Sequence, residues 1–417
     1  MRFTSTRPRP DRRLVVTTSG LLALTLAGCS GSTPGPGVSS SPATSASSTA
    51  ATASPSATST EDPAAACVRA TFESLSDDQR VGQLLMVGFD TGAPLDALDG
   101  LVARSHVGNV IYLGGWDGAD RVTRTSTHLQ GLASEKATGD VGLLIAADQE
   151  GGVVHQLRGE GFTRPPSASE QARMRPAELT RQARTWAAEL KDAGVNVNLA
   201  PVTDTVPKAI GTANEPIGRW GRQYGSTPEA VSRASTAFLE GMLEGGIEGT
   251  LKHFPGLGRI RSNTDFSSTG ITDRVATRDD PFLQPFADGI EAGAGLVMVS
   301  SARYPKLDPK NPAMFSTAIM TGLLREQMGY DGVVITDDVN AKALGDVAPP
   351  DRAVRVVAAG GDIVLTGAAS DADDMLEALS EASDDDPTMA GKVDAAVKRV
   401  LTLKERMGLL PCSTTKP

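Results

Sequence analysis

Short apolar segments recur along residues 67–412 and alternate with stretches of helical spacing. Several of these segments are nearly continuous apolar runs, as strands buried on both faces are. Strands that alternate with helices form parallel βαβ units. Eight units in this length predict a single (β/α)8 barrel of the TIM type, with an open doubly wound sheet as the alternative. The apolar segments are residues 84–89, 107–113, 142–147, 195–200, 247–251, 296–299, 332–335 and 362–365, and the clearest helical stretches are 176–193, 227–244, 371–382 and 392–407.

The first 28 residues have the pattern of an export signal. Residues 2–13 hold five arginines, residues 14–27 are mostly apolar, and Leu-Ala-Gly precedes Cys29. The apolar run is too short to span a bilayer. We therefore expect residues 1–28 to be a lipoprotein signal peptide and Cys29 to be lipidated. A plain secretory signal with a chance cysteine is the alternative.

Residues 29–66 are rich in Ser, Thr, Ala and Pro and show no apolar periodicity. Such a segment cannot bury a core, so it is expected to be a disordered tether before the barrel at 67–412 and the tail at 413–417. The protein is then extracytoplasmic and attached to the bacterial cell membrane through its lipid alone. We expect a monomer.

Cysteine and charge add further constraints. If Cys29 carries lipid, Cys67 and Cys412 remain, and an even remainder in an exported chain predicts a disulfide. Two free thiols are the alternative. The formal charge of −10 argues against a nucleic acid or an anionic membrane surface as partner. The four histidines are too scattered for a zinc site, and no metal or cofactor is expected.

Several polar motifs follow the apolar segments, where a barrel carries its chemistry. Residues 148–152 read Asp-Gln-Glu-Gly-Gly, 198–204 read Asn-Leu-Ala-Pro-Val-Thr-Asp, 252–256 read Lys-His-Phe-Pro-Gly, and 335–337 read Ile-Thr-Asp. Together they resemble glycoside hydrolase family 3, and most closely its single-domain β-N-acetylglucosaminidases, which act on peptidoglycan fragments. Many relatives in that family carry a second α/β domain, which we do not expect here because five residues follow Cys412.

The resemblance implies which residues bind the sugar. Asp148 matches a carboxylate that accepts hydrogen bonds from sugar hydroxyls, and Lys252 and His253 match a pair that donates to them. Alignment on the Tyr-Gly of residues 224–225 makes Arg222 the substrate arginine. Alignment on the Ile-Gly of residues 217–218 leaves Arg219 one position early as the alternative.

The same resemblance makes Asp337 the nucleophile, since it is the first Asp after the seventh apolar segment. A retaining glycosidase needs an ionised carboxylate beneath the anomeric carbon. Asp338 is the next residue along the strand, so its side chain is expected on the opposite face.

The chain departs from the family at several rim positions and at the general acid. Asp265 is present, but Ser267 replaces the histidine that serves as acid and base. We expect Asp265 to supply or relay the proton if burial raises its pKa. The alternatives are another carboxylate, or a weak or inactive hydrolase. The rim replacements are Val153 and Gln156 for arginines, with Arg158 near, and Leu257 for histidine, and the other candidate acids are Glu150, Glu215 and Asp273.

The resemblance implies a retaining exo-β-N-acetylglucosaminidase that releases terminal N-acetylglucosamine from muropeptide-like glycans. A non-catalytic glycan-binding lipoprotein is one alternative. A β-glucosidase or a glycosidic phosphorylase of the same family is the other.

Overall fold

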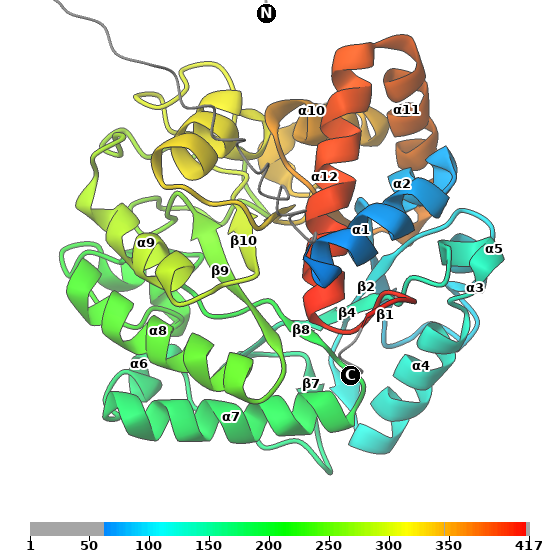
Figure 1. Cartoon of the computed structure of the whole chain (residues 1–417). Coiled ribbons are helices and arrows are strands. Elements are labelled where there is room, and N and C mark those ends of the chain that lie inside the picture. The colour runs from blue at the N-terminus through cyan, green and yellow to red at the C-terminus, as the bar shows by residue number, and fades with distance from the viewer. Residues whose placement is uncertain (1–61, 346, 414–417) are drawn as a thin grey trace, which may run out of the picture. The chain divides into compact units, whose positions relative to one another are not determined.

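The computed structural model describes residues 62–345 and 347–413, and its centre is a parallel barrel surrounded by helices (Figure 1). The strand order is β11-β10-β9-β8-β4-β2-β1-β12. A parallel bridge between Ile335 and Ile363 joins the two end strands, and the Thr336 amide donates to the Ile363 carbonyl at 3.0 Å. The predicted (β/α)8 barrel is therefore confirmed over the open sheet. The strands are β1 (Leu85–Asp90), β2 (Asn109–Leu113), β4 (Leu144–Ala147), β8 (Val197–Asn198), β9 (Glu248–Phe254), β10 (Leu296–Val299), β11 (Val333–Thr336) and β12 (Val364–Thr366).

Each predicted strand exists, but β9 is longer than expected. The apolar run ends at residue 251, whereas β9 continues to Phe254. Lys252 pairs with Met298 and Phe254 with Val299 of β10, so the ladder extends through the polar pair. Lys252 and His253 consequently lie on a strand of the barrel and not in the loop that follows.

The helices cover the outside of the barrel (Figure 1). Thr227 caps α8, because its hydroxyl accepts from the Ala230 amide at 3.4 Å and a proline follows it. The last helix begins at Pro387, five residues before the expected start, because Asp386 caps it in the same way. The helices are α1 (Pro63–Ser74), α2 (Asp77–Gly82), α3 (Asp99–Ala103), α4 (Ala119–Gly131), α5 (Glu135–Thr138), α6 (Ala168–Gln171), α7 (Pro176–Asp192), α8 (Pro228–Glu244), α9 (Gln284–Glu291), the π-helical η5 (Ala318–Gln327), α10 (Pro349–Ala359), α11 (Ala372–Asp385) and α12 (Pro387–Arg406).

The N-terminal boundary of the folded part differs from the prediction. Helix α1 begins at Pro63, so residues 63–66 are helical and not part of a disordered tether. Asp62 caps this helix, because its carboxylate accepts from the Ala64 amide at 3.3 Å and a proline follows it. The alanine-rich composition of these residues had instead indicated a tether. The predicted signal peptide, Cys29, the rest of the tether and residues 414–417 lie outside the described residues. Within the described residues, no helix is long and apolar enough to cross a membrane.

A buried carboxylate, Asp362, stabilises the barrel where its two end strands, β11 and β12, meet. Asp362 is fully buried and accepts from the Val334 amide at 2.7 Å. It also pairs with Arg325 at 2.6 Å and with Arg399 at 2.8 Å. Two guanidinium groups and a backbone amide satisfy a charge that burial alone would make costly. The arrangement fixes β11, the strand that ends at the predicted nucleophile.

The predicted disulfide between Cys67 and Cys412 is confirmed, with the two Cα atoms 5.6 Å apart. Cys67 lies in α1, which packs against α12 (Figure 1). The first and last parts of the barrel are thus linked covalently across 345 residues.

Replacing both cysteines by serine is expected to lower the melting temperature and leave the site unchanged. In the chain-entropy model so long a closed loop contributes about 5 kcal/mol. Calorimetry of the double variant, compared with the oxidised wild type, measures this effect. Turnover is the internal control, because the disulfide lies at the chain ends. An unchanged melting temperature would contradict the prediction.

Candidate active site

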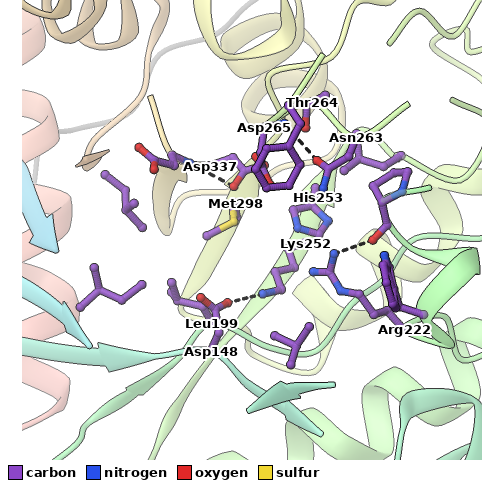
Figure 2. Close-up of a pocket in the computed structure, with 18 of the residues that line it drawn as sticks. Asp148, Leu199, Arg222, Lys252, His253, Asn263, Thr264, Asp265, Met298 and Asp337 are labelled. Carbon is purple, nitrogen blue, oxygen red and sulfur yellow. Dashed lines mark hydrogen bonds and ion pairs between the residues drawn. The ribbon is translucent and has the colours of Figure 1, made fainter. Parts of the chain in front are cut away.

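A cavity of about 470 Å³ opens at the carboxyl ends of the barrel strands (Figure 2). Its volume is within the range of small-molecule sites. Strand β9 and the loops after β4, β8, β9 and β11 bring the predicted residues to it, although these residues are far apart in the sequence. Its lining includes all six predicted substrate and catalytic residues: Asp148, Arg222, Lys252, His253, Asp265 and Asp337.

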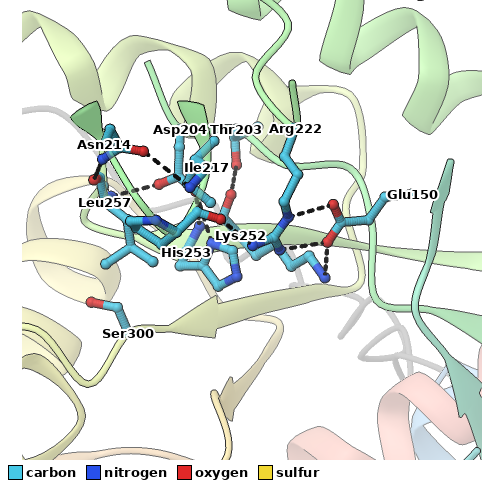
Figure 3. Close-up of polar contacts among 12 residues, drawn as sticks. Glu150, Thr203, Asp204, Asn214, Ile217, Arg222, Lys252, His253, Leu257 and Ser300 are labelled. Carbon is cyan, nitrogen blue, oxygen red and sulfur yellow. Dashed lines mark hydrogen bonds and ion pairs between the residues drawn. The ribbon is translucent and has the colours of Figure 1, made fainter. Parts of the chain in front are cut away.

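The wall of the cavity contains a buried cluster of charges (Figure 3). The Lys252 ammonium lies 2.5 Å from Asp148 Oδ1 and 2.6 Å from Glu150 Oε1. The Arg222 guanidinium binds Glu150 through two nitrogens, at 2.8 and 2.7 Å. Arg219 instead lies at the surface and pairs with Glu215 at 3.4 Å. Of the two arginines that the sequence left open, the structure places Arg222 in the cavity.

Glu150 is the counterion of this cluster and not a proton donor. Burial by itself would raise its pKa, but the charges of Arg222 and Lys252 lower the pKa of Glu150 to about 2. The Gly-Gly pair that follows shapes this turn, since Gly151 and Gly152 have φ of 101° and 62°. Glu150 is therefore ionised at any working pH and unsuited to donate a proton to a leaving group.

Glu150→Gln is expected to destabilise the fold and weaken sugar binding together. It leaves Lys252 and Arg222 buried with half of their counter-charge, and breaking a buried pair costs about 3–5 kcal/mol. Melting temperature and the KM for a small glycoside measure the two effects. Glu215→Gln is the matched control, because its exposed pair with Arg219 is worth about 1 kcal/mol or less. Equal melting temperatures for the two variants would refute the assignment.

A second buried pair orients His253. Asp204 is fully buried, and its Oδ2 lies 2.8 Å from His253 Nδ1. Its Oδ1 accepts from the Leu257 amide at 2.6 Å. Because a carboxylate only accepts, Nδ1 carries the hydrogen and Nε2 remains for a ligand. The sequence placed Asp204 in a family motif but did not indicate that it contacts the imidazole.

The loops after β8 and β9 are fastened to each other beside this pair (Figure 3). The side-chain Nδ2 of Asn214 donates to the carbonyls of Leu257 and Ile260 at 2.7 and 2.9 Å. Its Oδ1 accepts from the backbone amide of Ile217 at 3.0 Å. A Cβ at Gly258 would lie 1.8 Å from the Thr205 carbonyl oxygen, so only glycine fits there. These contacts fix Arg222 and His253 relative to one another.

Asp337 follows β11 directly and lines the cavity. Its amide donates to the Val299 carbonyl at 2.9 Å, and its Oδ1 accepts from the Asp338 amide at 3.0 Å. Asp338 also lines the cavity, so the expectation that it faces the other way is wrong. The strand ends at Thr336, and the alternation of side chains ends with it. The Asp338 carboxylate accepts two backbone amides, from Asn340 at 2.9 Å and Gly367 at 3.1 Å.

Asp265 comes to the cavity from the loop after β9 (Figure 2). Its amide donates to Asn263 Oδ1 at 3.0 Å, and its carbonyl accepts from the Lys342 amide at 3.1 Å. The residue as a whole is exposed to solvent, but it lines the cavity, where other protein groups surround its carboxyl. Burial of the carboxyl and the negative charge of Asp337 raise the pKa of Asp265 to about 6. Such a carboxyl carries a proton in mildly acidic solution.

The other candidate acids lie outside this cavity. Asp273 pairs with Arg259 at 3.2 Å and accepts from the Val275 amide at 2.7 Å. Neither Asp273 nor Glu215 lines the cavity. The Ser267 hydroxyl donates to the Thr269 carbonyl at 2.8 Å and does not line the cavity either. Asp265 is thus the carboxyl best placed to act with Asp337. Across the described residues, no group of three or more His, Cys, Asp or Glu side chains is arranged to hold a metal ion.

A pocket at the carboxyl end of a barrel that holds two aspartates beside a buried lysine, a buried histidine and an arginine is characteristic of glycosidases. Residues 76–403 match the glycosyl hydrolase family 3 N terminal domain. The chain belongs to glycoside hydrolase family 3.

Three similar proteins support this membership. The crystal structure of a β-N-acetylhexosaminidase from Beutenbergia cavernae is 46% identical, with a TM-score of 0.77, over 79% of this chain and 98% of the other. A family 3 β-N-acetylglucosaminidase from Paenibacillus is 31% identical, with a TM-score of 0.70, over 80% of this chain and 63% of the other. A β-hexosaminidase of Xylella fastidiosa is 32% identical over 61% of this chain and 76% of the relative.

Proposed function

We propose that the protein is a retaining exo-β-N-acetylglucosaminidase in which Asp337 is the nucleophile and Asp265 the acid and base. The observation that carries the proposal is the pair of carboxyl groups in one cavity, where burial and the charge of Asp337 raise the pKa of Asp265 to about 6. When two neighbouring carboxyl groups have different pKa values, the one with the higher pKa can act as the acid and the other as the charged nucleophile. The similarity to β-N-acetylhexosaminidases supports N-acetylglucosamine as the sugar.

The reaction takes two steps. Asp148, Lys252 and His253 hold hydroxyls of the terminal sugar, and the Asp337 carboxylate attacks the anomeric carbon. The bond to the leaving oxygen breaks, and that oxygen takes the proton of Asp265. Water then attacks the glycosyl ester while Asp265 accepts a proton from it, which restores the enzyme with retention at the anomeric carbon.

We propose cell-wall glycans of the muropeptide type as substrate, and a location outside the cytoplasm on a lipid anchor at Cys29. The support is the pattern of residues 1–29 and the tether composition that follows. Mass spectrometry of Cys29 in the exported protein tests the anchor. An unmodified cysteine there would contradict it.

Trapping tests the mechanism. Incubation with 5-fluoro-N-acetylglucosaminyl fluoride is expected to add one glycosyl group to the peptide that contains Asp337. The 5-fluoro group slows both steps, but the fluoride leaving group keeps formation of the glycosyl ester faster than its hydrolysis. Turnover of aryl N-acetylglucosaminide and aryl glucoside, with and without phosphate, separates a hexosaminidase from a glucosidase and from a phosphorylase. Binding of N-acetylglucosamine without turnover or adduct would instead indicate a glycan-binding protein with Ser267 in place of the acid.

A further inference from the structure

Exposed apolar side chains gather at the mouth of the active-site cavity. In the described part of the chain, five large hydrophobic side chains are strongly exposed, and three of these line this cavity. They are Val153, Trp220 and Phe266, which are 55%, 51% and 78% exposed. Single exposed apolar residues are ordinary on protein surfaces. Three at one cavity indicate a surface that binds something.

These three side chains, here called the apolar rim, come from separate loops. Val153 follows β5 (Gln149–Gly151), Trp220 ends the short helix η2 (Gly218–Trp220), and Phe266 lies in the loop after β9. The parent barrel strands β4, β8 and β9 are neighbours in the sheet. The fold, and not a local hydrophobic run, therefore brings the rim together.

The rim contrasts with the wall below it. Lys252 and His253 are 2% and 5% exposed and present polar groups for the hydroxyls of one sugar. Phe266 follows Asp265, which has to reach the leaving oxygen to protonate it. The rim is thus placed to contact the leaving group.

We propose that the apolar rim is a subsite for the leaving group and that it selects one with an apolar face. The inference rests on the proposed hydrolase activity and specifies its substrate. An alkyl or aryl group, or the CH face of a second pyranose, buries apolar surface on Val153 and Phe266 and lies flat on the Trp220 indole. A leaving group without an apolar face leaves these three side chains in contact with water.

A series of alkyl N-acetylglucosaminides tests the subsite, because methyl, butyl and hexyl alcohols differ little as leaving groups. A fully buried methylene is worth about fourfold in affinity. With partial burial, kcat/KM of the wild type is expected to rise about tenfold from the methyl to the hexyl glycoside. In Trp220→Ala and Phe266→Ala the rise should shrink to about twofold or less, because the hexyl glycoside loses more than the methyl glycoside does.

Leu95→Ala is the matched control, since Leu95 is 48% exposed and does not line the cavity. It should keep the tenfold rise. Chitobiose shows which leaving group the rim binds. If kcat/KM on chitobiose falls in the rim variants, the rim binds a second sugar. If kcat/KM on chitobiose stays unchanged, the rim binds alkyl or aryl groups. A wild type that cleaves the methyl glycoside with no rise along the series overturns the subsite alone. A wild type that cleaves none of the glycosides overturns the proposed function, and the subsite with it.

Discussion

Asp337→Asn is expected to abolish turnover while leaving the sugar pocket intact. The change removes the attacking charge but almost no volume, so kcat should fall by about four orders of magnitude or more. The dissociation constant of N-acetylglucosamine should stay within about tenfold, because Lys252 and His253 keep their buried partners. Steady-state kinetics on an aryl glycoside and calorimetric titration with the sugar measure the two quantities.

Asp338→Asn is the matched control for this prediction. Asp338 lines the same cavity and neighbours Asp337, but its carboxylate is bound to the backbone amides of Asn340 and Gly367. Both amides donate to the same oxygen, Oδ1, and an asparagine retains that acceptor, so a loss of about tenfold or less is expected. If Asp338→Asn were inactive and Asp337→Asn active, Asp338 would be the nucleophile. If both variants were active, the nucleophile would be neither of these two residues.

The barrel follows from the sequence because strands buried on both faces read as apolar runs. The same rule placed the end of β9 too early, since Lys252 and His253 are polar yet lie on the strand. These polar side chains are tolerated there because Glu150 and Asp204 come from other parts of the chain to contact them. Contacts of that kind depend on which loops become neighbours, and a single sequence does not give those distances.

The choice between Arg219 and Arg222 illustrates the same limit. Both fitted the motif, because alignment on residues 217–218 and alignment on residues 224–225 gave different arginines. The bidentate contact with Glu150 places Arg222 in the cavity, whereas Arg219 pairs with the exposed Glu215. The sequence did not indicate that Glu150 is a counterion, because that role depends on two cations, Lys252 and Arg222, from other parts of the chain.

Asp265→Ala is expected to cost far more with a poor leaving group than with an activated one. A sugar leaving group needs a proton, and proton donation is worth about 10²–10⁴-fold. The loss should therefore be about a thousandfold on a disaccharide and about tenfold or less on a dinitrophenyl glycoside. Azide should restore turnover of the activated glycoside, because it replaces the water that Asp265 no longer activates. Steady-state rates on the two substrates, with and without azide, measure these effects.

The pH profile gives an independent view of the same carboxyl. The pKa of Asp265 is raised to about 6, so its proton is present below that pH and lost above it. Activity of the wild type on a poor leaving group should decline above about pH 6, and this decline should vanish in Asp265→Ala on the activated glycoside. Ser267→Ala is the control, and its rate should stay within about twofold because the hydroxyl binds Thr269 of its own loop and does not line the cavity. If Asp265→Ala lost turnover equally on the poor and the activated leaving group, Asp265 would only shape its loop and would not donate the proton. A wild type that cleaves only activated glycosides, and slowly, would mean that the replacement of the family histidine by Ser267 has left a sugar-binding barrel without an acid.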